Sequence, residues 1–270
     1  MKTKNNTRDI AILGLFIALM AVLAFVPNIG FIPTPIGAIS LVHLPVIVGT
    51  LVLGFKKGMI LSLAFGIFSF IRAFTPMGIA DVAFQNPLVS ILPRLFIAPA
   101  TYGVYKLMQK LFTGAGKRMA KYSDNITGFI GGFTGTLIGV LVIILIFFAL
   151  SDKKFGMSPL LRTLIASPFG CLAGIGLYAA AKNKFKNPER SAVSFGCAAG
   201  SLANTVFTLL ALFIFMHNLS LEVLLTLLSI NGVLEIAVIT IVGTPVTLAI
   251  TGANRKKRTP VKEDSNAAGN

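Results

Sequence analysis

Long apolar segments dominate this sequence, and they restrict its possible folds more than any other feature. Most approach the ~20 residues that an α-helix needs to cross the ~30 Å hydrocarbon core of a bilayer. Because lipid offers the backbone no hydrogen-bond partners, a spanning segment is either a helix or a strand of a closed barrel. Barrel strands would alternate polar and apolar residues, whereas these segments are apolar throughout. The sequence therefore predicts an all-α, polytopic membrane helical bundle.

We expect about eight transmembrane helices. The apolar segments cover residues 9–27, 41–54, 57–74, 87–112, 126–150, 158–181, 189–216 and 231–252. The second is short and has Pro45 near its start, so we expect it to be tilted or partly buried. Residues 217–230 are amphipathic and suit an interfacial helix or loop better than a ninth span. Residues 1–254 are interpreted as one transmembrane domain, and residues 255–270 as a basic, disordered cytoplasmic tail.

The distribution of charge predicts the orientation of the chain. The net charge of +15 could suggest nucleic-acid binding, but the basic residues form short clusters between apolar segments. Cytoplasmic loops of membrane proteins are enriched in Lys and Arg. With the N-terminus inside, 19 of the 24 basic residues are cytoplasmic, namely Lys2, Lys4, Arg8, Lys56, Lys57, Lys106, Lys110, Lys117, Arg118, Lys121, Lys182, Lys184, Lys186, Arg190, Arg255, Lys256, Lys257, Arg258 and Lys262. Only Lys153 and Lys154 fall in outside loops. We therefore expect a cell-membrane protein in contact with lipid, with both termini cytoplasmic and no nucleic-acid partner.

Motifs that would indicate an enzyme are lacking. The two histidines, His43 and His217, are far apart and have no adjacent carboxylate. Both cysteines, Cys171 and Cys197, lie in apolar segments without metal-ligand spacing, and we expect them to be small buried hydrophobic residues. The GAGKR sequence beginning at Gly114 lacks the spacing and the hydroxyl residue of a phosphate-binding loop. We expect no enzymatic activity, catalytic residue, metal or cofactor.

Polar residues inside the predicted spans are the strongest candidates for a binding site, because a polar group in lipid is unfavourable unless it has a role. The candidate substrate-binding residues lie in or beside the outer half of the predicted bilayer, and they are Arg94, Asn204, Thr205, Asn231, Glu235, His43 and Asn86. Arg94 suits an anionic group such as a carboxylate. The amides and Glu235 suit hydroxyl or amide groups. The sequence thus predicts an outward-facing pocket for a small polar molecule.

Structural roles are open for some of these polar residues. Arg94, in a helix that Pro93 and Pro99 are expected to bend, could form an internal ion pair. Asn204 could hydrogen-bond to a neighbouring helix. Arg72, near the outer end of its span, could anchor at the membrane interface.

The first predicted helix carries a stripe of small residues at spacings of three and four, formed by Ala11, Gly14, Ala18 and Ala21. Small residues let another helix approach closely. The stripe therefore predicts a helix-docking face, either for a partner protein or for another helix of this chain.

Several stretches of the sequence together resemble one family of membrane proteins. They are AILGLFIALMAVLAF, ISLVHLPVIVGTLVLGFKKGMILSLAFGIFSFI, PLVSILPRLFIAPATYGVYK, AAGSLANTVFTLL and NGVLEIAVITIVGTPV, in this order along the chain. The sequence resembles the substrate-binding (S) components of energy-coupling factor (ECF) vitamin transporters, most closely the pantothenate-type branch. The resemblance implies a six-helix core, so that residues 126–181 would be an inserted helix pair.

The resemblance also implies a function and partners. An S component captures a vitamin from outside and works with a transmembrane scaffold (T) component and two cytoplasmic ATPases. By resemblance, Gly14 and Ala18 would meet the scaffold, and the loop at residues 28–40 would close the pocket. The leading hypothesis is capture of a small anionic vitamin, with pantothenate as the best candidate. The alternatives are a stand-alone secondary transporter or permease for a small organic anion, which the extra helices suggest, and a scaffold or assembly factor that binds no ligand.

Overall fold

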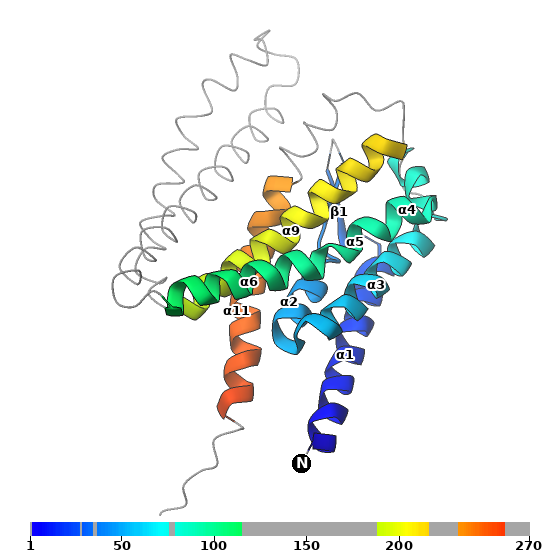
Figure 1. Ribbon diagram of the computed structural model, residues 1–270. Coiled ribbons are helices and arrows are strands. Elements are labelled where there is room, and N and C mark those ends of the chain that lie inside the picture. Colours follow the sequence, from blue (N-terminus) through cyan, green and yellow to red (C-terminus); the bar gives the residue numbers. More distant parts are fainter. Residues whose placement is uncertain are drawn as a thin grey trace, which may run out of the picture.

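The computed structural model of the 270-residue chain describes residues 2–27, 29–34, 37–75, 79–114, 188–215 and 232–256. Within them the chain is helical apart from one short β-hairpin (Figure 1). The helices are α1 (Lys2–Phe25), α2 (Leu44–Leu53), α3 (Phe55–Arg72), the 3₁₀-helix η1 (Ile79–Gln85), α4 (Pro87–Ser90), α5 (Leu92–Leu95), α6 (Ile97–Gly114), α9 (Pro188–Phe215) and α11 (Val233–Lys256). The strands are β1 (Phe31–Thr34) and β2 (Gly37–Ser40).

The described residues include 4 segments long and apolar enough to cross a membrane, namely Thr7–Phe25, Pro87–Leu111, Glu189–Phe215 and Glu235–Gly252. The chain is therefore a multi-pass membrane protein, as the sequence predicts. Every predicted span that falls on described residues coincides with a helix or a group of helices. The predicted spans at 126–150 and 158–181 lie outside the described residues, as does the segment 217–230. The total of about eight spans stays a prediction.

Helix α2 is short but central to the bundle. It packs against α1, α3, α6, α9 and α11, and every residue from Pro45 to Thr50 is buried, which confirms the expectation of a partly buried segment. Pro45 lies in the first turn, where its missing N–H interrupts no helical hydrogen bond, so it begins the helix rather than breaking it. Gly54, with φ of 87°, joins α2 to α3 in a backbone conformation that favours glycine.

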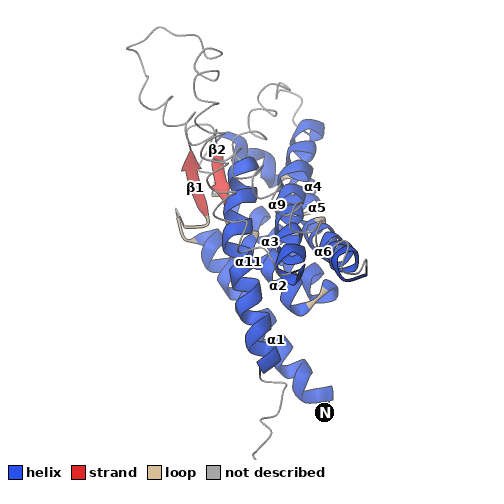
Figure 2. Cartoon of the chain, turned by 90° about the vertical axis from the view of Figure 1, so that its left-hand side faces the viewer, coloured by secondary structure: helices blue, strands red, loops and turns tan. Residues whose placement is uncertain are grey.

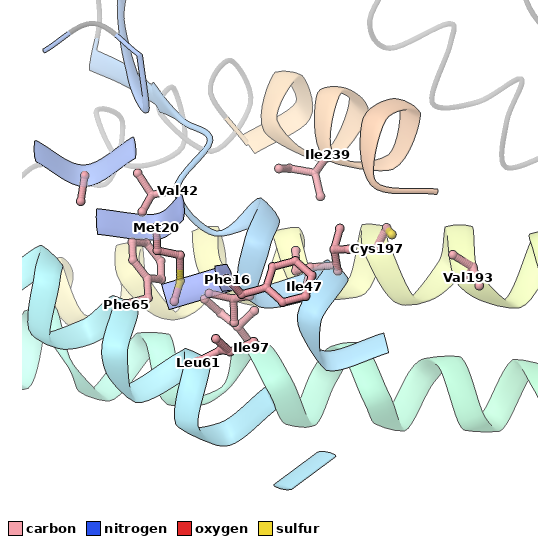
Figure 3. Packing of buried hydrophobic residues seen from close by; sticks show 13 residues of the cluster. Phe16, Met20, Val42, Ile47, Leu61, Phe65, Ile97, Val193, Cys197 and Ile239 are labelled. Carbon is pink, nitrogen blue, oxygen red and sulfur yellow. The ribbon is translucent and has the colours of Figure 1, made fainter. Parts of the chain in front are cut away.

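The largest hydrophobic cluster surrounds α2. Figure 3 shows Ile47 of α2 among apolar side chains from the neighbouring helices, including Phe16, Met20, Leu61, Phe65 and Ile97. All of these residues are buried. The bundle therefore has a core between helices that lie far apart in the sequence.

Helix α9 lies along α6 and α11. At Gly200 the helices approach so closely that an added Cβ would lie 2.1 Å from Thr101 Oγ1 and 2.8 Å from Ile47 Cγ1. Thr244 of α11 also donates a hydrogen bond to Ser194 of α9, with 3.1 Å between their hydroxyl oxygens. Small and hydroxyl residues at contacts of this kind are typical of membrane helices, whose association depends on close packing and hydrogen bonds.

The predicted span at 87–112 is bent, as its prolines indicate. It consists of α4, α5 and α6 in succession. Pro93 has no N–H to donate to the carbonyl of Val89, four residues earlier, so the helical hydrogen-bond ladder is interrupted there. The bend places Arg94 in the short helix α5.

Residues 28–40, which the sequence predicts as a loop, contain the antiparallel hairpin. Its register pairs Phe31 with Ser40 and Thr34 with Gly37. Strands of four residues, interrupted by proline, are too short to show a clear periodicity in the sequence. Figures 1 and 2 show that, within the described residues, the hairpin lies far from the N-terminal end of α1. The bundle itself is all-α, and the hairpin is an addition at one end.

Candidate functional site

A cluster of polar side chains lies where the hairpin meets the helical bundle. It includes Ser40 at the end of β2, His43 just before α2, Arg94 of α5, Glu235 of α11 and several residues of α9. The exposed fractions of His43, Arg94 and Glu235 are only 0%, 6% and 5%. Buried polar groups inside a membrane protein mark a functional site by default, so this cluster is the candidate site.

Glu235 joins the hairpin to two helices. Its Oε1 accepts a hydrogen bond from the backbone N–H of Ser40 at 2.7 Å, although the two residues are 195 positions apart. Its Oε2 accepts a hydrogen bond from the Thr205 hydroxyl of α9 at 3.0 Å. Hydrogen bonds to a carboxylate are stronger than bonds between neutral groups. These two bonds therefore hold the carboxylate and the hairpin in place.

His43 is hydrogen-bonded to α9, with 3.1 Å between its Nε2 and the Ser201 hydroxyl. Its Nδ1 has no hydrogen-bond partner among the described residues. In a catalytic Ser–His pair a third group normally orients the imidazole. The described part of the chain places no such group at His43 Nδ1.

One face of α9 points into the cluster. Ser201, Asn204, Thr205 and Thr208 recur at helical spacings of three and four, and therefore share a face. Ser201 and Thr205 contact His43 and Glu235, while Asn204 is only 6% exposed. Asn204 Oδ1 has no hydrogen-bond partner among the described residues. The alternative of a helix–helix hydrogen bond through this oxygen thus finds no support in them.

The position of Arg94 follows from the bend at Pro93. The carbonyl of Val89, which Pro93 cannot serve, accepts a hydrogen bond from Arg94 Nη1 at 2.7 Å. The Arg94 guanidinium carbon also lies 4.9 Å from the ring centroid of Phe84 and 5.7 Å from that of Phe65, within the range of cation–π attraction. Within the described residues Arg94 forms no ion pair, so the alternative of an internal ion pair finds no support there.

Several buried polar atoms of the cluster have no hydrogen-bond partner among the described residues, namely Arg94 Nε, His43 Nδ1, Asn204 Oδ1 and Ser40 Oγ. An unmade buried hydrogen bond costs about 1–3 kcal/mol. A ligand that pairs with these atoms would remove that cost. A guanidinium donates to an anion, and an amide oxygen accepts from hydroxyl or N–H groups. The arrangement therefore suits a small anion that carries such groups.

Some predicted site residues have other positions. Asn86 is exposed, and its Oδ1 accepts a hydrogen bond from the backbone N–H of Leu88 at 3.0 Å. The structure thus gives Asn86 the role of an N-cap for α4. Asn231 lies outside the described residues. Arg72 lies with its guanidinium carbon 3.9 Å from the ring centroid of Phe31, at the base of the hairpin.

Two residues of the cluster are not among the site residues predicted from the sequence. Ser201 lies one helical turn before Thr205, so the spacing along α9 could have indicated it. Ser40 contributes its backbone N–H to Glu235, and a backbone group has no signature in the sequence.

The small-residue stripe of α1 lies on the outside of the described bundle. Ala11, Gly14 and Ala18 are exposed and Ala21 is partly exposed. The buried face of α1 lies on the opposite side and includes Phe16, Met20 and Ala24. A Cβ added at Gly14 would have no atom within 4 Å. The described residues therefore give no support to the alternative that another helix of this chain covers the stripe.

Comparison with known proteins identifies the family. Residues 8–167 match the family described as the substrate-specific component of the ECF transporter. The chain belongs to this family. The match covers the hairpin, His43 and Arg94, and it confirms the resemblance noted in the sequence.

Two relatives of this chain both carry the name PanT. One is the pantothenic acid transporter PanT of Lactococcus lactis subsp. cremoris (strain MG1363), which is 33% identical over 182 residues, covering 61% of this chain and 85% of the relative. The other is the pantothenate transporter PanT of Leuconostoc mesenteroides subsp. mesenteroides, which is 26% identical over 102 residues, covering 35% of this chain and 49% of the relative. Both relatives are named as pantothenate transporters, which agrees with the resemblance to the pantothenate-type branch.

Proposed function

We propose that this S component captures pantothenate from the outer face of the cell membrane. One observation carries the proposal: Arg94 is a buried cation whose Nε has no hydrogen-bond partner among the described residues. Pantothenate is a small molecule with a carboxylate, an amide and two hydroxyl groups. Its carboxylate would pair with Arg94 by charge-assisted hydrogen bonds. The names of both relatives support the same substrate.

The other unpaired polar atoms of the cluster would bind the rest of the ligand. Asn204 Oδ1 would accept a hydrogen bond from a hydroxyl or from the amide N–H, and His43 Nδ1 would pair with a neighbouring polar group. Thr205, which donates a hydrogen bond to Glu235, would line the same side of the site. Asn231, outside the described residues, stays a predicted contact.

Binding to purified protein tests the substrate directly. Native mass spectrometry should find pantothenate bound to the protein as purified, or after it is added to ligand-free protein. Isothermal titration with a panel of vitamins should then rank pantothenate first. Binding of none of them at micromolar concentration would refute the proposal.

The partners are those of the family, a T scaffold and two cytoplasmic ATPases, and the exposed stripe of α1 is the proposed docking face. We propose that the end of the bundle that carries the N-terminus is cytoplasmic, because basic residues lie there. Lys57, at the start of α3, forms an ion pair with Asp9 of α1. That contact joins the basic turn between α2 and α3 to the start of α1, and it supports an orientation with both on the cytoplasmic side.

Uptake by reconstituted liposomes tests the partners. Gly14→Leu should abolish ATP-driven pantothenate uptake in liposomes that contain the T scaffold and both ATPases, and should leave pantothenate binding unchanged. Gly103→Leu is the matched control, since Gly103 is also an exposed helical glycine with nothing within 4 Å of an added Cβ. Accumulation driven by an ion gradient, without the ATPases, would instead support the stand-alone transporter.

A further inference from the structure

The base of the hairpin is attached to α11 through the backbone of β2. The Leu41 N–H donates a hydrogen bond to the carbonyl of Gly30 at 2.7 Å. Gly30 directly precedes β1, so the Leu41 N–H points toward β1. Successive N–H groups along a strand point in opposite directions, so the Ser40 N–H points away from β1. There it donates to Glu235 Oε1 at 2.7 Å. The outer edge of β2 is thus bound to a buried carboxylate.

The same end of the hairpin is attached to α3 through β1. Phe31, which pairs directly with Ser40, lies under the guanidinium of Arg72 at 3.9 Å from Cζ to the ring centroid. A cation over an aromatic face is attracted by the negative potential of the ring. The two residues of this terminal pair therefore contact groups of opposite charge, Glu235 and Arg72, on two different helices.

These attachments matter because the hairpin is small. Each strand has 4 residues, and an isolated two-stranded hairpin is at best marginally stable. Its position therefore depends on its contacts with the helices. Glu235 also accepts a hydrogen bond from Thr205, the neighbour of Asn204, so the attachment lies beside the candidate binding residues.

We propose that Glu235 and Arg72 are positioning residues that clasp the base of the hairpin over the binding site and set how often it opens. Glu235 then acts on the ligand through Ser40 and the hairpin rather than by direct contact. The proposed function supplies only the identity of the ligand; the clasp itself follows from the contacts of Glu235 and Arg72. The two clasp contacts, one ionic hydrogen bond and one cation–π contact, are independent of each other and can be weakened separately.

Hydrogen–deuterium exchange of the ligand-free protein in lipid nanodiscs tests the clasp. Glu235→Gln keeps the shape of the side chain but removes its charge, and should make the amides of residues 37–42 exchange roughly tenfold faster, since a charge-assisted bond is about twice as strong as a neutral one. Phe31→Leu should accelerate the same amides roughly 5- to 25-fold, from about 1 to 2 kcal/mol of cation–π attraction converted at 1.4 kcal/mol per tenfold. Ser40→Ala is the matched control, because it keeps the backbone N–H that Glu235 accepts, and it should leave this exchange unchanged.

The proposal is overturned if the amides of residues 37–42 exchange at the wild-type rate in both Glu235→Gln and Phe31→Leu. The helices must stay protected from exchange in both variants for this comparison. Weaker pantothenate binding by Glu235→Gln without faster hairpin exchange would also overturn it, since Glu235 would then contact the ligand directly. A second measurement follows dissociation of radiolabelled pantothenate, which should be accelerated in both variants. If the wild-type protein binds no pantothenate, the proposed function fails, while the exchange experiment still decides whether the clasp exists.

Discussion

Replacing Arg94 tests the binding site most directly. Arg94→Ala should remove the cation that pairs with the ligand carboxylate. A hydrogen bond to a charged group contributes about 1.5–3 kcal/mol, and each 1.4 kcal/mol changes a dissociation constant tenfold. The Kd for pantothenate should therefore rise roughly 10- to 150-fold. The side chain is 6% exposed, so water offers little compensation for the lost contact.

The same substitution also removes a structural contact. The Val89 carbonyl would lose the donor that accounts for its 2.7 Å hydrogen bond, which should lower the free energy of unfolding by about 1–3 kcal/mol. Arg94→Lys keeps the positive charge but not the planar fork that can serve Val89 and a carboxylate together. Its Kd should lie between those of the wild type and Arg94→Ala. Thermal unfolding in detergent separates loss of folding from loss of binding.

A ligand analogue isolates the carboxylate contact. Isothermal titration compares pantothenate with its neutral alcohol analogue, which lacks the carboxylate, on the wild-type protein and on Arg94→Ala. The wild type should prefer pantothenate by roughly the same 10- to 150-fold factor, and Arg94→Ala should bind both ligands about equally. A folded Arg94→Ala protein that still discriminates between them would refute the pairing of Arg94 with the carboxylate.

Two further predictions concern α9. Asn204→Ala should weaken pantothenate binding by about 1–3 kcal/mol, the cost of leaving a ligand donor unpaired, in the same titration; Leu202→Ala, at a 46% exposed position of the same helix, should not. Gly200→Ala should lower the melting temperature, because the added Cβ would lie 2.1 Å from Thr101 Oγ1. Gly103→Ala, with nothing within 4 Å of its added Cβ, should leave the melting temperature unchanged or raise it, since alanine favours a helix over glycine. Equal effects of the two glycine substitutions would contradict the close packing at α9.

The parts of the fold that the sequence predicts are those with a local cause. A run of apolar residues long enough to cross lipid can only be a helix or a barrel strand, so the described helices could be located from composition alone. Pro93 predicts the bend near Arg94 because its ring removes a backbone N–H. The hairpin of β1 and β2 escaped prediction because its strands are short and the contacts that fix it come from Arg72 and Glu235, far away in the sequence.

In the candidate site, too, some features follow from the sequence and others from the tertiary structure. The sequence alone determined that Arg94, Asn204 and Glu235 are polar residues in apolar surroundings, since the free energy of placing such groups in lipid depends on residue type and depth. Only the tertiary structure decided that Glu235 contacts Ser40, 195 positions away, and that Asn86 caps a helix on the surface. Such contacts depend on how helices pack, and helix packing depends on shapes that no local pattern records.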